Sequence, residues 1–289
     1  MFAITGITGK VGGALANTLI AAGHPVRAVV RDAQRARAWA DRGCDMALAH
    51  MEDPAGLAAA FEGAQGVFIL PPSDFDPAPG YPEARRVIDA VRIALTLSAP
   101  KKVVCLSTIG AHAVEDNLLT QRTLMEQTLR ELPLPVTFLR PGWFMENAAW
   151  DVASARDEGI LHSYLQPLDK PVPMVATADV GRVAAGLLLD SWEGVRVVEL
   201  EGPHPVTPND IARAFARILG HSVQAEATPR ASWEAQFRSQ GMKHPMPRIR
   251  MLDGFNEGWI DFSGSTPPLR GEIALETILR ALVEDAPAD

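Results

Sequence analysis

Three glycines near the start of the chain have a spacing that could hold a phosphate group. Gly6, Gly9 and Gly12 lie in the segment TGITGKVG, residues 5–12, between a short apolar run and an alanine- and leucine-rich stretch. Such a turn lets a pyrophosphate approach bare backbone at the N-terminus of the helix that follows. A tight turn without a ligand is the alternative, because glycine-rich turns occur in many folds. The complete strand, turn, helix and strand over residues 1–32 favours dinucleotide binding.

A positive residue stands where the adenosine ribose of such a dinucleotide is expected. Arg31 directly follows the second apolar run, residues 26–30. An acidic residue at this place binds the 2′-hydroxyl of NAD, whereas an arginine can pair with the 2′-phosphate of NADP. The chain has a net charge of −8, so an anionic cofactor needs local positive groups. This supports the interpretation of Lys10 and Arg31 as phosphate-binding residues. Solvated surface charge is the alternative for both. We expect NADP(H) in preference to NAD(H).

Three side chains are weak candidates for a proton donor. His112 lies in a loop after the fifth expected strand, Tyr164 could face a substrate cleft, and Tyr81 begins a long helix. Histidine and tyrosine can act as general acids, but ordinary packing or solvation is the alternative for each. Motifs for zinc binding, thiol redox chemistry or a hydrolase nucleophile are absent from the sequence. We therefore expect no metal site, and the catalytic residue stays unknown.

The elements that must position these residues alternate between strand and helix. Continuous apolar runs predict strands buried on both faces of a parallel sheet, and the amphipathic stretches between them predict crossover helices. The expected strands are 2–4, 25–30, 45–49, 66–70, 102–106, 136–139 and 196–200. The expected helices are 11–20, 35–42, 54–61, 83–97, 118–131, 178–189, 208–219 and 271–283, with two more between 229 and 261. The predicted fold class is α/β, a Rossmann-type doubly wound parallel sheet with a smaller, mostly helical C-terminal portion that binds substrate.

The expected division of the chain falls near residue 150. Residues 1–150 would form the NAD(P)-binding Rossmann domain, and residues 151–289 the smaller C-terminal portion. We expect the two to be interleaved, with the helix around 178–190 packing back on the sheet, because no flexible linker separates them.

Composition narrows the class of protein. The 289 residues contain no dense cluster of lysine and arginine, so we expect no direct binding to nucleic acid. Two cysteines, Cys44 and Cys105, fit a reducing cytoplasm better than a disulfide framework. The sequence contains neither a signal peptide nor an apolar run near the roughly 20 residues that span a bilayer. These features predict a cytoplasmic protein without a membrane segment.

Five segments stand in the order and spacing of a known family. They are residues 5–12, 26–32, 62–68, 139–147 and 175–181. Together they resemble the NmrA-like branch of the atypical short-chain dehydrogenase/reductase superfamily, which is NAD(P)-binding and includes quinone-oxidoreductase-like members. The resemblance is looser over the C-terminal residues.

The resemblance implies a cofactor that lies across the C-terminal ends of the strands. Its contacts would come from the glycine turn, the tip of the second strand, and the ends of the fourth, fifth and sixth strands. The implied residues are Gly6, Thr8, Gly9, Lys10, Val11, Gly12, Arg31, Leu70, Pro71, Ser107, Thr108, Pro141, Phe144 and Asn147. At the third strand the family has Gly-Asp where this chain has Ala49 and His50, so the adenine contacts stay open.

The resemblance also locates a missing pair of catalytic residues. Catalytic members of the wider superfamily carry Tyr-x-x-x-Lys on the helix after the fifth strand, where the tyrosine transfers a proton and the lysine lowers its pKa. The matching positions here are Leu118 and Arg122, and leucine can neither donate nor accept a proton. Arg122 could contact the cofactor, or it could only pair with Glu126 one turn later.

Two functions from different classes are compatible with these features. The favoured hypothesis is an NADPH-dependent reductase of a flat, electron-poor small molecule such as a quinone, a dye or a conjugated carbonyl. Such acceptors take a hydride to give a stabilised anion that water can protonate, so they need no dedicated tyrosine. The alternative is a non-catalytic NADP(H) redox sensor that acts on a regulatory protein partner. Either would be a monomer or a homodimer.

Overall fold

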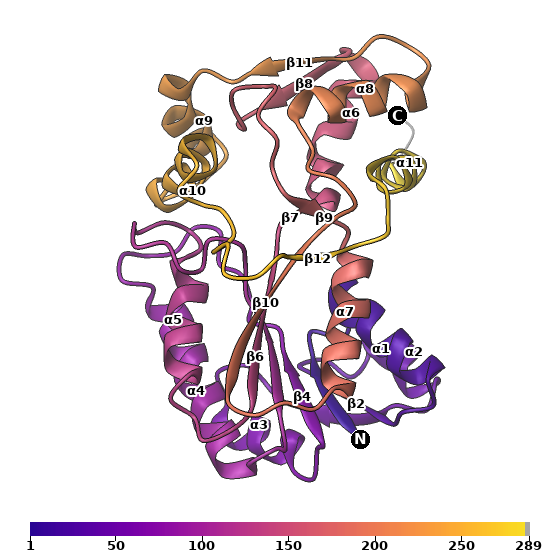
Figure 1. The fold of residues 1–289 in the computed structure, drawn as a ribbon, viewed down its shortest axis with the longest axis vertical. Coiled ribbons are helices and arrows are strands. Elements are labelled where there is room, and N and C mark those ends of the chain that lie inside the picture. Colours follow the sequence, from indigo (N-terminus) through magenta and orange to yellow (C-terminus); the bar gives the residue numbers. More distant parts are fainter. Residues whose placement is uncertain (287–289) are drawn as a thin grey trace.

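An eight-stranded parallel sheet forms the centre of the molecule in a computed structural model that describes residues 1–286. Its strands run in the order β12-β10-β6-β5-β4-β1-β2-β3 (Figure 1). They are β1 Phe2–Thr5, β2 Val26–Val30, β3 Asp45–Leu48, β4 Gly66–Ile69, β5 Val103–Leu106, β6 Val136–Pro141, β10 Val195–Glu201 and β12 Leu269–Arg270. The order reverses between β1 and β4, and ligands of open α/β sheets bind at such a point. The predicted α/β class and doubly wound sheet are confirmed.

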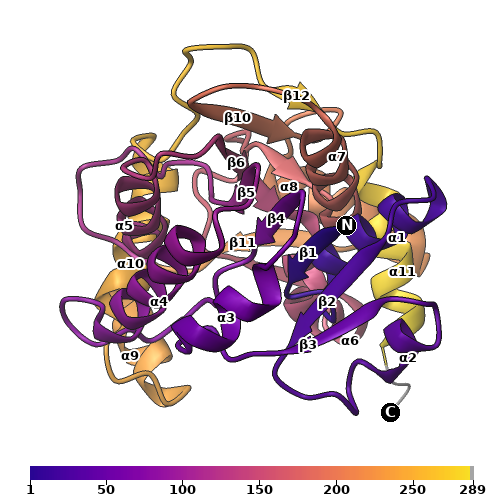
Figure 2. The ribbon, with the colours of Figure 1, turned by 90° about the horizontal axis from the view of Figure 1, so that it is seen from below.

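Helices cover both faces of this sheet (Figure 2). The helices α1 (Lys10–Ala21) and α7 (Thr177–Leu189) share one apolar layer, with α2 (Arg37–Ala40) beside them. The helices α3 (Pro54–Phe61), α4 (Pro82–Ser98) and α5 (Thr120–Leu129) form the other. Gly181 lets α7 approach α1 closely, since a Cβ atom there would come within 2.6 Å of the Val11 carbonyl oxygen.

The upper half of the molecule is built from residues that follow β6 (Figure 1). Its elements are β7 Trp143–Phe144, the 3₁₀ helix η1 Met145–Asp151, α6 Val152–Asp157, β8 Ile160–Ser163, β9 Met174–Val175, α8 Pro208–Leu219, β11 Gln224–Ala227, η2 Arg230–Ser232, α9 Trp233–Ser239, α10 Met246–Glu257 and α11 Leu275–Asp285. Their apolar core surrounds the fully buried Trp233, Phe237 and Phe215. Because α7, β10 and β12 return to the main sheet, the two halves of the chain interleave. Among residues 1–286, no helix is long and apolar enough to cross a membrane.

Three of the expected helices differ from the observed ones in where they begin or end. The expected helix 35–42 is reduced to α2, because only Ala36 and Trp39 pack against the protein there. The expected helix 118–131 begins at Thr120, since Asn117 bonds the backbone just before it. The C-terminal helix begins four residues late because the backbone of 271–273 is bonded to β10 and to Asp179. The strand pairs β7–β9 and β8–β11 were not predicted, because such short strands show no recognisable alternation of apolar and polar residues.

Candidate functional site

The glycine turn between β1 and α1 is shaped by two of its three glycines. Gly6 has a φ of +68°, which favours glycine, and a Cβ atom on Gly12 would lie only 2.3 Å from the Gly6 carbonyl oxygen. Gly9 is different: its Cβ would make only an ordinary 3.4 Å contact, and the residue is exposed. Gly6 and Gly12 therefore bend the chain tightly, while Gly9 leaves open backbone at the turn.

The N-terminus of α1 has unused hydrogen-bond donors. No side chain caps the helix at Gly9, and no acidic residue lies in its first turn. Within residues 1–286, the backbone N–H groups of Lys10, Val11 and Gly12 have no acceptor, since the first helical bond runs from Gly13 to Gly9. Free N–H groups and the helix dipole both favour a bound phosphate. The residues at this turn therefore fit the pyrophosphate of a dinucleotide.

Positive charge is left unpaired at the tip of β2. The Asp32 carboxylate accepts a hydrogen bond from the Gln34 backbone at 2.9 Å and so forms a local turn. The exposed Arg31 has no ion pair within the described part of the chain, and neither has Lys10 across the turn. These two side chains are free to meet an anionic group near the end of the sheet.

The exit of β4 lies beside the glycine turn. The Thr5 hydroxyl donates to the Phe68 carbonyl at 3.1 Å and accepts from the Leu70 N–H at 2.8 Å. The Leu70 side chain lies against Gly6, about 3.1 Å from the place of a Cβ there. Leu70 therefore stands beside the glycine turn, at the edge where β1 and β4 part.

Arg122 holds the loop that follows β4. Its guanidinium donates to the Pro71 carbonyl at 3.0 Å, the Pro72 carbonyl at 3.3 Å and the Ser73 hydroxyl at 2.7 Å. Burial lowers the pKa of Arg122 to about 10, so the group stays charged at neutral pH. The expected alternative, a pair with Glu126, is wrong. Arg122 instead positions Pro71, which was expected at the cofactor ribose.

The helix α5 contributes no proton-transfer pair. Leu118 is buried in the apolar core, and its backbone N–H donates to the Pro247 carbonyl at 2.9 Å. Tyr81 does not fill the gap: its buried hydroxyl donates to Asp116 at 2.6 Å and lies 2.9 Å from the Asn117 carbonyl oxygen. Burial and the Asp116 carboxylate raise the pKa of Tyr81 well above its usual range. Tyr81 therefore anchors a loop.

Ser107 belongs to a buried polar cluster between the sheet and α5. Its hydroxyl donates to Glu126 at 2.5 Å, while Arg140 grips the same carboxylate with bonds of 2.8 and 2.7 Å. Arg130 adds a third cationic contact at 3.0 Å. Burial opposes ionisation of Glu126, but Arg140 outweighs it and holds the pKa of that carboxyl below its usual value. The Ser107 hydroxyl is thus committed to Glu126, whereas the half-buried Thr108 side chain is free of hydrogen bonds within residues 1–286.

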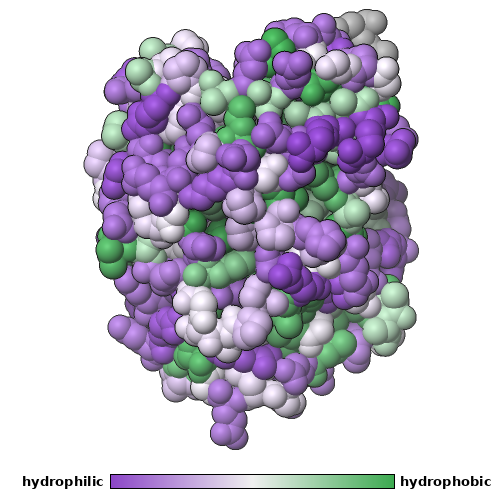
Figure 3. Space-filling model, turned by 45° about the horizontal axis from the view of Figure 1, so that its top comes forward, coloured by the Kyte–Doolittle hydropathy of each residue, from purple (hydrophilic) through white to green (hydrophobic). Residues whose placement is uncertain are grey.

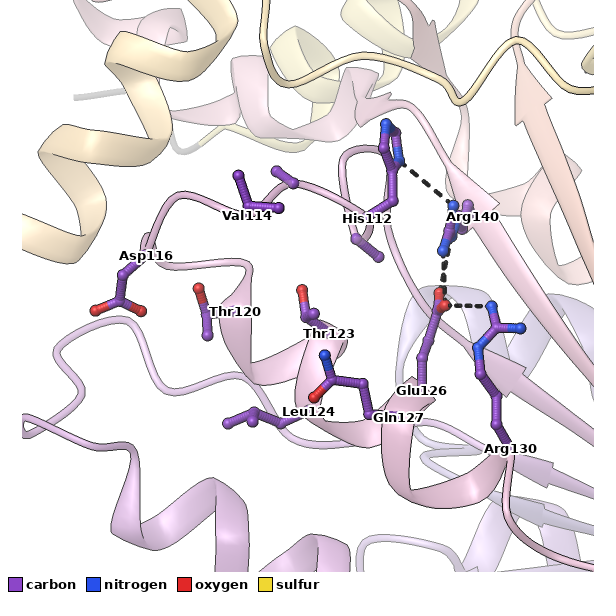
Figure 4. Close-up of a pocket in the computed structure, with 12 residues that line it drawn as sticks. His112, Val114, Asp116, Thr120, Thr123, Leu124, Glu126, Gln127, Arg130 and Arg140 are labelled. Carbon is purple, nitrogen blue, oxygen red and sulfur yellow. Dashed lines mark hydrogen bonds and ion pairs between the residues drawn. The ribbon is translucent and has the colours of Figure 1, made fainter.

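His112 lies beside Arg140 of this cluster (Figure 4). Its Nδ1 atom is 3.5 Å from the Arg140 guanidinium, and it lines a pocket of about 480 Å³ between its loop and α5. None of the residues expected to bind the cofactor lines that pocket. Among residues 1–286, no group of three or more histidine, cysteine or acidic side chains could hold a metal ion.

The segment after β6 leaves one polar side chain unused. Gly142 lets the chain pass the Pro173 carbonyl, which a Cβ atom would meet at 2.5 Å, and Trp143 packs edge-on against Phe255 at 5.2 Å. Glu146 accepts the Thr177 N–H at 2.9 Å, at the start of α7. Asn147 is half-buried and its amide makes no hydrogen bond within the described residues. A ligand at the end of β6 could use this amide. The partly buried Phe144 lies three residues before Asn147. The carbonyl of the buried Pro141 accepts a hydrogen bond from the Ile109 N–H.

Comparison with known proteins assigns this arrangement to a family. The model of the NmrA-like family matches residues 1–247. The chain belongs to the NmrA-like family. The match includes the doubly wound sheet apart from β12, the glycine turn and the exit of β6. The resemblance seen in the sequence is therefore confirmed.

Two curated relatives of this NmrA-like protein are reductases. An NAD(P)H azoreductase from Xenophilus azovorans is 26% identical over 260 residues, covering 89% of this chain and 85% of the relative. A (4-alkanoyl-5-oxo-2,5-dihydrofuran-3-yl)methyl phosphate reductase from Streptomyces griseus subsp. griseus is 28% identical over 228 residues, covering 78% and 76%. The crystal structure of NADPH-dependent quinone oxidoreductase QOR2 from Escherichia coli, complexed with NADPH, has the same fold. Its TM-score is 0.73 at 23% identity, covering 98% of this chain and 95% of that one.

Sequence reasoning missed two charged residues of this NmrA-like protein that lie around Tyr164. The Tyr164 hydroxyl is 2.9 Å from Gln236 Oε1, and the Asp151 carboxylate and Arg248 guanidinium both act on it electrostatically. Burial raises the pKa of Asp151 to about 7, and its carboxylate accepts no hydrogen bond within residues 1–286. No motif marks either residue. The only available sequence signal was the position of Asp151, four residues after Asn147.

Proposed function

We propose that this NmrA-like protein is an NADPH-dependent reductase of a flat, electron-poor acceptor, such as a quinone, a dye or a conjugated carbonyl. One observation carries the proposal: the free N–H donors at the start of α1 fit a dinucleotide, while the buried Leu118, just before α5, stands in place of the usual proton donor. Acceptors whose reduced form is a stabilised anion do not need that donor. The names of the relatives, which include azo and furanone reductases, support the same class of acceptor.

The proposed cofactor site follows the C-terminal edge of the sheet from β2 to β6. The free N–H groups of Lys10, Val11 and Gly12 would hold the pyrophosphate, and Arg31 the 2′-phosphate that distinguishes NADP from NAD. Leu70 and Pro71 would line the ribose. The cofactor supplies a hydride when bound.

The nicotinamide end of the proposed site lies between the exits of β5 and β6. Thr108, Phe144 and Asn147 would bound it there, with the Asn147 amide available to a carboxamide. Residues 1–150 would thus carry the cofactor, and residues 151–289 would supply most of the acceptor site.

Titration and turnover together test the proposal. The purified chain is titrated with NADPH and NADH, and then assayed for NADPH consumption with naphthoquinones, azo dyes and unsaturated ketones. The reductase requires tight NADPH binding and turnover with at least one acceptor. Tight binding without turnover on any of them would instead support a redox sensor acting on a protein partner.

A further inference from the structure

Arg248, on α10, carries a charge that the protein does not neutralise. Its half-buried guanidinium makes no hydrogen bond and no ion pair within residues 1–286. Two neighbouring arginines of the same half are paired, Arg230 with Asp253 at 2.6 Å and Arg238 with Glu234 at 2.9 Å. Burial lowers the pKa of Arg248, so holding its charge there is unfavourable unless an acceptor approaches. A bound anion would offset the desolvation cost of this half-buried, unpaired charge.

Aromatic rings surround the Arg248 guanidinium. Its central carbon lies 4.6 Å from the centre of the Phe237 ring and 5.8 Å from that of Trp150. Phe237 in turn lies 5.1 Å from the Tyr164 ring. Trp150 keeps 68% of its surface exposed, so its ring is open to solvent. The site therefore combines an unpaired cation with an open aromatic face.

The site lies close to the exit of β6. In a 3₁₀ helix, side chains three residues apart lie on the same face, so Trp150 on η1 shares a face with Asn147. The helix α10, to which Arg248 belongs, lies in the left upper lobe of Figure 1, and the Arg248 guanidinium carbon lies over the Trp150 ring. Figure 3 shows the surface notched between the two upper lobes. A ligand against Trp150 would thus reach Arg248 and the face of η1 that carries Asn147.

We infer that Trp150 and Arg248 form an acceptor subsite for a flat aromatic molecule with an anionic substituent, a sulfonate or a carboxylate. The ring would stack on Trp150, and the planar fork of Arg248 would bind two oxygens of the anion. This inference rests on the proposed reductase function, whose acceptor it makes more specific. A free inorganic anion has the same charge chemistry, but it would gain nothing from the aromatic face.

Binding of non-reducible probes tests the subsite without any turnover. Naphthalene-2-sulfonate and the neutral naphthalene-2-sulfonamide are titrated into the full chain, with and without NADP⁺, by calorimetry. We expect the sulfonate to bind about tenfold more tightly or better. Arg248→Gln should remove that preference and Arg248→Lys should keep part of it. Trp150→Ala should weaken the binding of both probes.

Arg250 is the matched control. It stands on the same helix two residues later and so on another face, with its guanidinium 5.5 Å from the centre of the Trp259 ring. Arg250→Gln should leave the preference for the sulfonate unchanged. Equal binding of both probes to the unmodified chain, or an undiminished preference in folded Arg248→Gln, would overturn the inference. Inorganic phosphate that binds as tightly as the sulfonate would show a general anion site, and this result would also overturn the inference. If the sulfonate preference holds but no acceptor is turned over, the proposed function fails and the subsite stands.

Discussion

The Arg122 guanidinium donates a hydrogen bond to the Pro71 carbonyl oxygen, with 3.0 Å between the two atoms. This bond joins α5 to the loop after β4, across the edge of the sheet where the cofactor is proposed to lie. In the superfamily that the chain resembles, a lysine at the Arg122 position lowers the pKa of a tyrosine. Here the tyrosine position is Leu118, and the cation holds the loop after β4 instead.

Arg122→Ala should weaken NADPH binding by about tenfold or more, because hydrogen bonds from a charged group contribute roughly 1.5 to 3 kcal/mol each. Without the guanidinium, three acceptors at Pro71, Pro72 and Ser73 lose their donor. Fluorescence titration with NADPH measures the effect. Arg85→Ala is the control, since Arg85 bonds the Gly80 carbonyl on the exposed side of α4. An unchanged dissociation constant in Arg122→Ala would contradict this role.

Arg31→Gln should lower the preference for NADPH over NADH by about tenfold or more, because a charge-assisted bond to phosphate is lost. The affinity for NADH should hardly change, since NADH has no 2′-phosphate. Arg35→Gln is the comparison, as Arg35 is another exposed arginine on the same loop. If both variants reduce the NADPH affinity equally, general electrostatic attraction and not a specific contact explains the preference.

Glu126→Gln should destabilise the fold by about 3 to 5 kcal/mol, the usual cost of removing one partner of a buried ion pair. The variant leaves Arg140 and Arg130 without their carboxylate. At about 2 to 4 °C for each kcal/mol, the melting temperature at neutral pH should fall by roughly 10 °C. Glu131→Gln, an exposed change on the same stretch, should have little effect.

The contribution of Glu126 also has a pH dependence of known sign. Its pKa is lower in the folded protein than in the unfolded chain, so its stabilisation is fully present above the ordinary pKa of a glutamate. It is lost as the pH falls through the lowered value. Glu126→Gln and the unmodified chain should therefore approach each other in stability in acid. A constant difference at all pH values would contradict the ion pair.

Asp151→Asn should stabilise the protein in the alkaline range. Burial raises the pKa of Asp151 to about 7, so the folded state holds a proton that the unfolded chain releases near pH 4. Asp151 therefore costs stability increasingly as the pH rises between these values, and no further above them. The gain in melting temperature should be larger at about pH 8 than at about pH 5.

Asp157→Asn is the control for this prediction. Asp157 is exposed, and a hydrogen bond from Arg156 lowers its pKa, so its replacement should not stabilise the chain at alkaline pH. A gain for Asp151→Asn that is independent of pH would show that packing, rather than ionisation, is responsible.

Local patterns were sufficient for the sheet and for the glycine turn. The apolar runs at 66–70 and 102–106 predicted β4 and β5 to within one residue at each end, because strands buried on both faces need continuous apolar residues. The turn at 5–12 was readable because its chemistry depends on backbone geometry within a few residues.

The contacts of the charged side chains were not predictable in this way. The acceptors of Arg122 stand about fifty residues earlier in the chain, and Glu126 pairs with Arg140 on a strand, so helix spacing suggested the wrong partner. Asp151 and Arg248 belong to no motif. Their importance comes from burial and from missing partners, which only the folded arrangement of η1 and α10 reveals.

The proposed reductase binds NADPH at the glycine turn and needs no tyrosine, because its acceptor gives a stabilised anion. The most direct test follows NADPH consumption by the purified chain with a naphthoquinone or an azo dye, in parallel with the variant Arg31→Gln. We expect turnover that requires the acceptor, and a higher KM for NADPH in Arg31→Gln with little change in kcat. Tight NADPH binding without turnover on any acceptor would contradict it.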